Sequence, residues 1–249
     1  MSYKKITKIQ SVATILTLLF NIIIHFCYGM EMIINCSLIN STIPAQPRKI
    51  YAAGSGLDML SQPDTISEII ALSGKKKPNV LYIGTATYDA EEEMNIQTKA
   101  FTARGCEVTA LKITHGDPGI NSMCRSVENA DILLVSGGNT LFAVDRMVTV
   151  GLDQIIKGAG NAGKVLCGGS AGGIVWFENG HSDSGDPVSF LNPNGPLFKN
   201  NLTQKQLGSA WNYVKVPGLN ILPGLFVPHF DKIESNGQRR NVSAKQLLR

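Results

Sequence analysis

Residues 164–177 read KVLCGGSAGGIVWF, and this stretch decides the fold because an apolar strand runs straight into a glycine-rich turn. The turn GGSAG, at residues 168–172, is a G-x-S-x-G sequence. A strand, such a turn and a helix, in that order, are the context of a nucleophile elbow, whose glycines leave room for a tight bend. We therefore expect a strained Ser170 with its hydroxyl at the sheet edge, followed by a short helix over residues 174–177.

Four more short apolar runs predict the other strands of this sheet. They are residues 49–53 (KIYAA), 79–83 (NVLYI), 106–113 (CEVTALKI) and 131–135 (DILLV). Helical patterns lie between them at residues 64–72, 89–104 and 140–150. Apolar strands that alternate with helices are typical of a parallel sheet covered on both faces. The sequence therefore predicts one α/β domain over residues 48–249, doubly wound and mostly parallel.

Small and polar residues follow four of the predicted strands. They form the turns at residues 54–56 (GSG), 84–87 (GTAT), 136–139 (SGGN) and 168–172. Ligands bind at the carboxyl ends of strands in open α/β sheets, where these turns would meet. This edge is the candidate active site.

A serine nucleophile needs a general base, and three histidines follow residue 29. His115 lies in a loop after the third strand and is expected at the surface. His229 directly follows the apolar residues 219–227, and a strand-end position would bring it to the edge that holds Ser170. We favour His229, with His181, eleven residues after the serine, as a competitor.

The other parts of a serine-hydrolase site have several candidates. The acid that orients the base is open among Glu178, Asp183, Asp186 and Asp231. The oxyanion hole would use the amide of Ala171 and a second amide from Gly137 or Gly138, where glycine permits a close approach. Asn139 joins these glycines on the substrate-binding side. Cys167 is a rival nucleophile, but its place on the strand predicts burial.

The composition excludes several classes of protein. The chain has 249 residues, 43% of them hydrophobic and 17% charged, as in an ordinary globular protein. Its formal charge is +4, but after residue 29 there are 20 basic and 19 acidic residues. A body this close to neutral has no electrostatic footprint for nucleic acid.

Residues 1–29 combine a basic head with an apolar run, the pattern of a secretory signal peptide. An uncleaved signal-anchor is the alternative, and only that form would place the protein at a membrane. If the leader directs the chain to the secretory pathway and is cleaved, the protein is extracellular. If the leader is not part of the protein, the chain starts at Met30 or Met32 and is cytoplasmic. Residues 30–47 are polar and aperiodic and are expected to be a linker.

Cysteines and sequons say less about the compartment. After the leader the cysteines are Cys36, Cys106, Cys124 and Cys167, without a C-x-x-C pair or metal-site spacing, so a metal site is not expected. Cys106 and Cys167 are expected to be buried free thiols, and no disulfide can be assigned. Four N-x-S/T sequons, at Asn35, Asn40, Asn201 and Asn241, give weak support to secretion.

Four segments occur in an order that resembles a known family. They are residues 131–147 (DILLVSGGNTLFAVDRM), 167–172 (CGGSAG), 176–184 (WFENGHSDS) and 228–231 (PHFD). Together they resemble the peptidase E (alpha-aspartyl dipeptidase) family of serine peptidases, to which cyanophycinase is related. The resemblance implies a flavodoxin-like sheet, similar to class I glutamine amidotransferases, and a Ser–His–acid dipeptidase without a cofactor. The matching residues are Ser170, His229 and Asp183.

The chain departs from this family in two ways. Family members continue past the PHFD-like motif through further strands, whereas this chain ends at Arg249, so the sheet is expected to lack its last strands. A pocket for an N-terminal aspartate needs a cation, and residues 178–187 contain none. The nearest in sequence are Arg146, Lys199 and Lys215.

Three functions remain in competition. The favoured one is a serine exopeptidase for short peptides, N-terminal aspartyl peptides among them. The second is a catalytically inactive binding domain on the same fold. The third, nucleotide binding, is weak because no glycine segment completes a dinucleotide or P-loop motif. A small peptide is thus the expected partner, and the oligomeric state, a homo-oligomer included, is open.

Overall fold

The computed structural model describes residues 35–39, 45–185, 213–233 and 239–247. The chain divides into two compact units after Asn35, and all that follows concerns the unit from Cys36 onward. The predicted leader and most of the predicted linker lie outside the described residues. In the described part, no helix is long and apolar enough to cross a membrane.

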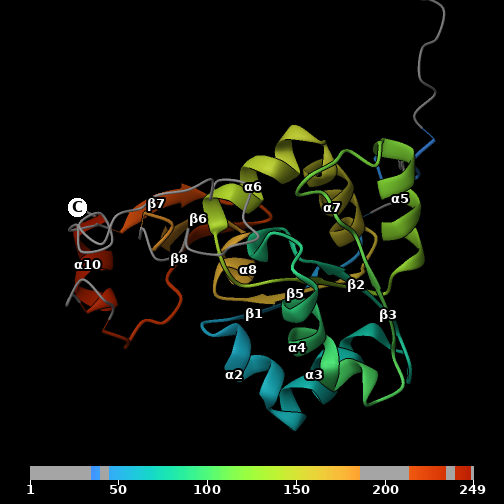
Figure 1. Ribbon diagram of the computed structural model, residues 1–249, viewed down its shortest axis with the longest axis horizontal. Coiled ribbons are helices and arrows are strands. Elements are labelled where there is room, and N and C mark those ends of the chain that lie inside the picture. The colour runs from blue at the N-terminus through green and yellow to red at the C-terminus, as the bar shows by residue number, and fades with distance from the viewer. Residues whose placement is uncertain (1–34, 40–44, 186–212, 234–238, 248–249) are drawn as a thin grey trace, which may run out of the picture. The chain divides into compact units, whose positions relative to one another are not determined.

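A five-stranded parallel sheet in the order β1-β5-β4-β2-β3 forms the centre of this unit (Figure 1). Its strands are β1 (Lys49–Ala53), β2 (Asn79–Ile83), β3 (Glu107–Ala110), β4 (Ile132–Val135) and β5 (Val165–Gly169). All four pairs of neighbours are parallel. The five predicted strands and the mostly parallel α/β sheet are therefore confirmed.

Helices cover both faces of this sheet. They are α2 (Gly56–Ser61), α3 (Pro63–Ser73), the 3-10 helix η1 (Thr85–Thr87), α4 (Glu91–Thr102), α5 (Ile120–Asn129), α6 (Thr140–Thr149) and α7 (Leu152–Asn161). The chain moves outward from β1 through β2 to β3 with α2–α4 on one face, then returns through β4 to β5 with α5–α7 on the other. Right-handed crossovers require this change of face when the direction of winding reverses.

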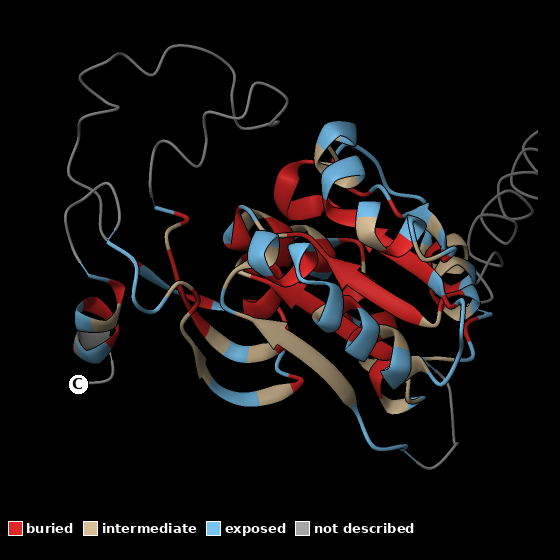
Figure 2. Ribbon diagram, turned by 90° about the horizontal axis from the view of Figure 1, so that it is seen from below, coloured by how far each residue is buried: buried red, intermediate tan, exposed pale blue. Residues whose placement is uncertain are grey.

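Successive side chains of the strands pack alternately into two separate hydrophobic cores. On β4, Leu133 packs in the cluster with α5–α7, whereas Ile132 and Leu134 pack in the cluster with α2–α4. Successive side chains of a strand point to opposite faces, so a strand buried on both sides must be apolar at every position. Figure 2 shows the resulting buried strands between partly exposed helices.

A smaller three-stranded sheet in the order β7-β6-β8 follows the elbow. Its strands are β6 (Phe177–Ser182), β7 (Val214–Pro217) and β8 (Leu222–Phe226), with β6 antiparallel to β7 and parallel to β8. A final helix, α10 (Arg240–Leu247), packs through Arg240 on residues at the end of β6.

Several boundaries differ from the sequence analysis, and two of these differences have a clear structural reason. The third strand ends at Ala110 because the amides of Ile113 and Thr114 donate to the carboxylate of Asp89. The helix expected over residues 174–177 instead begins directly after the serine, as α8 (Ala171–Ile174). Phe177 already belongs to β6, and its ring stacks on that of Phe226 in β8.

A disulfide between Cys36 and Cys124 anchors the start of this unit to α5. Next to it, the Ser37 hydroxyl donates to the carboxylate of Glu128. Cys106 and Cys167 are free and buried, as expected. Part of the predicted linker is therefore fixed to the domain.

Candidate active site

Ser170 lies at the turn between β5 and α8 and has the backbone angles φ 55° and ψ −121°. A non-glycine residue with positive φ is strained and persists only where its surroundings hold it. Here the amide of Ser170 donates to the carbonyl of Ala53 on β1, at 3.0 Å. The carbonyl of Ser170 in turn accepts from the amide of Ile174 in the first turn of α8, at 3.1 Å. The local structure is that of a nucleophile elbow.

The glycines on both sides of the serine are needed for this turn. A Cβ atom on Gly172 would lie 2.1 Å from the carbonyl oxygen of Val135, and one on Gly168 would lie 2.6 Å from that of Gly172. These contacts are with backbone atoms, which cannot swing away. The steric reason for the G-x-S-x-G pattern therefore holds in the structure.

His229 is the histidine that reaches Ser170. Its Nε2 lies 3.0 Å from the serine Oγ, and both residues are half-buried. The histidine follows β8 in a turn where its own φ is 48°. Its amide donates to the carbonyl of Gly54, in the loop after β1, at 3.2 Å. This hydrogen bond joins the second sheet to the carboxyl edge of the first.

His181, the competing base, lies elsewhere and is fully buried. Arg240 Nε donates to its Nδ1 at 3.4 Å, so Nε2 carries the proton that it shares with Ser243 Oγ, at 3.1 Å. Burial, and then the neighbouring Arg240 charge, lower the pKa of His181 to about 4. A neutral imidazole here is part of the packing between β6 and α10.

The remaining nucleophile and base candidates do not meet at the elbow. Cys167 is fully buried on β5, and burial raises the pKa of its thiol far above the ordinary value. A thiol in this state is not ionised and is a poor nucleophile. His115 is exposed, as expected.

The four candidate acids have different surroundings. Asp183 follows β6, and its Oδ2 lies 3.5 Å from Nη1 of the buried Arg240. Glu178 accepts from the amide of Gly224, at 3.4 Å. Asp231 is exposed and lines a cavity that His229 also lines. Asp186 lies outside the described residues.

The four predicted turns meet around one pocket of about 280 Å³. Ser55 and Gly56 contribute from the first turn and Thr87 from the second. Gly137 and Gly138 contribute from the third turn, and Ser170 from the fourth, with His229 opposite. The prediction that these turns lie together at the sheet edge is confirmed.

Glycine at position 138 allows the third turn to approach η1, while Gly137 in the same turn lies beside the serine. A Cβ on Gly137 would lie 3.5 Å from Cβ of Ser170, and one on Gly138, whose φ is 124°, would lie 2.3 Å from the carbonyl oxygen of Ala86. Ala171 starts α8 directly behind the serine and is buried. The three residues predicted to supply oxyanion amides thus surround the elbow.

Asn139 caps α6, and its side chain is buried. Its Oδ1 accepts from the amide of Phe142 at 3.1 Å, and its Nδ2 donates to the hydroxyl of Tyr88 at 3.0 Å. Both ends of the amide are therefore used in holding the third turn against the residues that follow η1.

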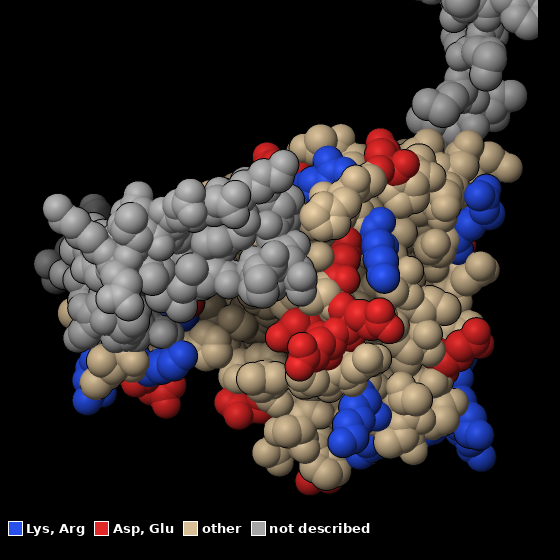
Figure 3. Space-filling view, in the orientation of Figure 1, with Lys and Arg blue, Asp and Glu red and all other residues tan. Residues whose placement is uncertain are grey.

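Three pocket residues, Leu57 on α2 and Glu93 and Gln97 on α4, were not among the predicted site residues. The acidic first turn of α4 looks in the sequence like a favourable interaction with the helix dipole. Figure 3 shows acidic side chains in the middle of the face where Figure 1 places α4. The spacing of Glu93 and Gln97, one helical turn apart, was the available signal.

Neither a lysine nor an arginine lines this pocket within the described part of the chain. Of the three cations that the sequence offered, Arg146 donates to the carbonyls of Ile113 and Gly116, at 2.8 and 2.7 Å. Lys215 is exposed on β7, and Lys199 lies outside the described residues.

The described residues bring together one group with metal-ligand atoms, Cys36, Cys124 and Glu128. Because the two sulfurs are bonded to each other, this group does not offer a thiolate pair to a metal.

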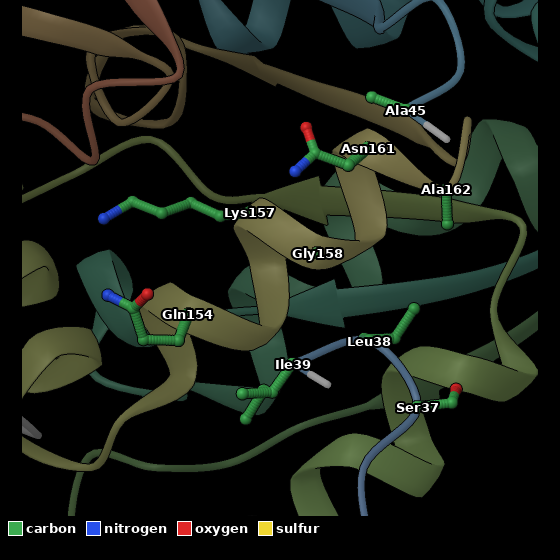
Figure 4. Close-up of a pocket in the computed structure, with 9 residues that line it drawn as sticks. All are labelled: Ser37, Leu38, Ile39, Ala45, Gln154, Lys157, Gly158, Asn161 and Ala162. Atoms are coloured by element: carbon green, nitrogen blue, oxygen red, sulfur yellow. The ribbon is translucent and has the colours of Figure 1, made fainter. Parts of the chain in front are cut away.

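A second cavity, of about 340 Å³, shares no residue with the pocket at Ser170. Figure 4 shows it between the segment at Ser37–Ile39 and one side of α7, with Gln154, Lys157 and Asn161 at its wall. Among the described residues, its lining contains neither a serine–histidine pair nor a carboxylate.

Comparisons with known proteins agree with this arrangement. The model of peptidase family S51 matches residues 50–249. The uncharacterized peptidase YgaJ of Bacillus subtilis (strain 168) is 29% identical over 185 residues, which cover 73% of this chain and 68% of the relative.

Two solved structures match much of the chain, and the first of them is similar in fold. A peptidase from an acI-B1 actinobacterium has a TM-score of 0.54 and 20% identity, and the match covers 80% of this chain and 75% of the other. A protein assigned as a peptidase E, from Listeria monocytogenes EGD-e, has a TM-score of 0.48 and 19% identity over 70% and 75% of the two chains. The resemblance to peptidase E seen in the sequence is confirmed, and the chain, a serine peptidase, belongs to peptidase family S51.

Proposed function

We propose that this protein is a serine exopeptidase that hydrolyses dipeptides and other short peptides, with Ser170 as nucleophile and His229 as general base. The observation that carries the proposal is the 3.0 Å distance between Ser170 Oγ and His229 Nε2 inside a pocket at the sheet edge. A nucleophile and base within hydrogen-bond reach are the diagnostic pair for acyl transfer.

The proposed reaction has two halves. Ser170 Oγ attacks the scissile carbonyl while His229 Nε2 takes the serine proton and then gives it to the leaving amine, which departs as the acyl-enzyme forms. Water then attacks the acyl-enzyme with His229 again as base, and the serine is released. The amides of Ala171 and of Gly137 or Gly138 would stabilise the negative oxygen of each tetrahedral intermediate.

The acid that orients His229 is proposed to be Asp183. Its place supports this proposal, because it lies half-buried directly after β6 and between Ser170 and His229 in the chain, which is the Ser…Asp…His order of such triads. Asn139 is proposed to act on the substrate side through the position of the third turn, since its own side chain is buried.

The small size of the pocket supports the proposal that the protein is an exopeptidase. Its volume of about 280 Å³ is at or below the low end for small-molecule sites. A long peptide threaded through the site would need a groove, whereas a dipeptide needs little more than this pocket.

The test is the release of free amino acid from a panel of X-Leu dipeptides by the full chain and by its Ser170→Ala variant. Cleavage by the parent chain and its loss in a variant with an unchanged melting temperature support the proposal. A folded parent chain that cleaves none of the dipeptides contradicts it and favours a binding domain on the same fold.

We also propose that the chain enters the secretory pathway. The Cys36–Cys124 disulfide supports this proposal, because such bonds persist in oxidising compartments and are rare in the cytosol. Expression of the full chain in cultured eukaryotic cells tests it. Protein in the medium with a new N-terminus near residue 30 supports cleavage, membrane retention supports a signal-anchor, and cytosolic protein with free Cys36 contradicts both.

A further inference from the structure

The charge that lines the pocket beside Ser170 is negative. Glu93 is the one acidic residue among the described residues that form its wall, and the wall has neither lysine nor arginine in that part of the chain. A pocket with this lining attracts a cationic group and repels a carboxylate. The inference below rests on the proposed function, since it concerns which peptides that site accepts.

Glu93 faces inward, unlike its two neighbours in the first turn of α4. Glu91 and Glu92 are exposed, whereas Glu93 is half-buried. One turn later the buried Gln97 donates from its Nε2 to Oε2 of Glu93, at 3.1 Å. Because the two side chains lie on one face of the helix, this hydrogen bond fixes the carboxylate toward the pocket.

A second observation places the Glu93 charge on the inner side of α4. Burial, and to a lesser degree the charges of Glu93 and Asp89, raise the pKa of Tyr82 to about 12. Tyr82 is a buried residue of β2, and its hydroxyl lies 3.4 Å from Oγ1 of Thr87, which also lines the pocket. The charge of Glu93 therefore reaches a buried residue that neighbours the pocket wall at Thr87.

The hydrogen-bonding capacity of Glu93 is not used up by the protein. An ionised carboxylate can accept about four hydrogen bonds, and Gln97 supplies one. Within the described residues, no lysine or arginine forms a salt bridge with it. A half-buried carboxylate in this state binds an ammonium or guanidinium group more strongly than an exposed one does.

We propose that Glu93 is a specificity-determining residue that accepts a cationic group of the peptide, next to the carbonyl that Ser170 attacks. The cation is either the free α-ammonium of the N-terminal residue or the side chain of an N-terminal lysine or arginine. Peptides with an N-terminal aspartate are disfavoured, because their side-chain carboxylate meets a like charge.

Binding to the Ser170→Ala protein tests this proposal without turnover. Calorimetry would compare Lys-Leu, Met-Leu, Asp-Leu and Nα-acetyl-Met-Leu on Ser170→Ala, on Ser170→Ala with Glu93→Gln, and on Ser170→Ala with Glu92→Gln. Gln at position 93 keeps the shape and the partner Gln97 while removing the charge. Glu92 is the matched control, since it is exposed on the same helical turn.

We expect Lys-Leu to bind about tenfold or more tightly than Asp-Leu, and Glu93→Gln to reduce this ratio to about threefold or less. Glu92→Gln should leave the ratio unchanged. If acetylation of Met-Leu weakens its binding, and this loss of affinity requires Glu93, the cation that Glu93 accepts is the α-ammonium. A Glu93-dependent preference for Lys-Leu over Met-Leu assigns it to the side chain.

An unchanged Lys-Leu to Asp-Leu ratio in the Glu93→Gln protein, or no binding of any of these peptides, overturns the proposal. Failure of the proposed function looks different, because it appears as absence of dipeptide cleavage by the parent chain. Cation-selective binding without cleavage would therefore reject the peptidase activity and retain the assignment of Glu93.

Discussion

The imidazole of His229 meets the hydroxyl of Ser170 across the boundary between two sheets. Their reacting atoms lie 3.0 Å apart although 59 residues separate them in the chain. Ser170 sits at the end of β5 in the parallel sheet, and His229 follows β8 in the smaller sheet. The hydrogen bond from the His229 amide to the carbonyl of Gly54 holds this junction together. The geometry of the proposed catalytic pair therefore depends on docking of the second sheet.

Replacing His229 by glutamine should remove the general base and leave the fold intact. We expect kcat for the best dipeptide to fall by about 10³-fold or more, because the serine cannot be deprotonated by glutamine. His115→Gln is the control, since His115 is exposed and is not among the described residues that line the pocket at Ser170. Equal activity of the two variants at equal melting temperature would reject His229 as the base.

Asp183→Asn should show whether this residue orients His229. An asparagine keeps the shape but favours the wrong imidazole tautomer, so kcat should fall by about 10³–10⁴-fold. Glu178→Gln should keep its activity, because Glu178 is exposed on β6.

The contact of Asp183 with Arg240 calls for a second variant in that experiment. Arg240→Gln breaks the ion pair and keeps the Asp183 carboxylate. If Arg240→Gln lowers kcat as much as Asp183→Asn does, the effect comes from the packing of α10 and Asp183 is not the acid. A large loss for Asp183→Asn alone supports the assignment.

The elements of the large sheet were predictable because each is dictated locally. Strands such as β4 are buried on both faces and so are apolar at every position. The four turns of the site were predictable for a related reason, since the carboxyl ends of parallel strands must share an edge. The place of Ser170 at a strained turn was predictable from the glycines of the G-x-S-x-G sequence around it.

Strand β8 was expected from the apolar residues 219–227, whereas β6, β7 and α7 depend on distant contacts, which explains why the sequence did not reveal these three. β6 contains mostly polar residues (FENGHS), and α7 contains glycines, which disfavour a helix. The structure needs Gly158 in α7, because a Cβ there would lie 2.1 Å from the carbonyl oxygen of Leu38. For Glu93 the one local signal was its spacing from Gln97, one helical turn later, which Glu91 and Glu92 lack.

Gly172→Ala should destabilise the protein as well as inactivate it. The added methyl would lie 2.1 Å from the carbonyl oxygen of Val135, so β4 or the elbow must move. We expect a loss of about 3 kcal/mol, or a fall in Tm of roughly 6–12 °C. Gly116→Ala is the control, because nothing lies within 4 Å of its added Cβ. Thermal melts in which both variants match the parent chain would show that the elbow tolerates a side chain at position 172.

Reduction of the Cys36–Cys124 disulfide should lower the stability of the domain. The bond joins two residues that are 88 positions apart and so lowers the conformational entropy of the unfolded chain. We expect this restriction to raise the free energy of unfolding by about 2–4 kcal/mol. Melting with and without a reductant measures this effect, and a Cys36→Ser variant should melt at the lower temperature under both conditions. An oxidised protein that melts like the variant would mean that the bond contributes nothing to the folded domain.

His181 should make the domain sensitive to mild acid. Its pKa is about 4 in the folded protein, against an ordinary value of 6.5, because burial and then Arg240 oppose protonation. The unfolded chain therefore binds a proton that the folded chain does not, between pH 6.5 and about 4, and the free energy of unfolding falls as the pH falls through this range. The other groups around the imidazole are Asp183, whose charge acts in the opposite direction, and the uncharged side chains of Ser243 and Tyr213.

The difference between the ordinary pKa of 6.5 and the folded value of about 4 contributes about 3 kcal/mol to the free energy of unfolding at neutral pH. Urea unfolding of the parent chain and of His181→Gln, from pH 4 to 7.5, measures it, because glutamine can keep a hydrogen bond to Ser243 without titrating. The parent chain should lose more stability than His181→Gln over this range, whereas the exposed His115→Gln control should follow the parent. Parallel curves for the parent and His181→Gln would mean that water reaches the imidazole and that β6 and α10 are not closed around it.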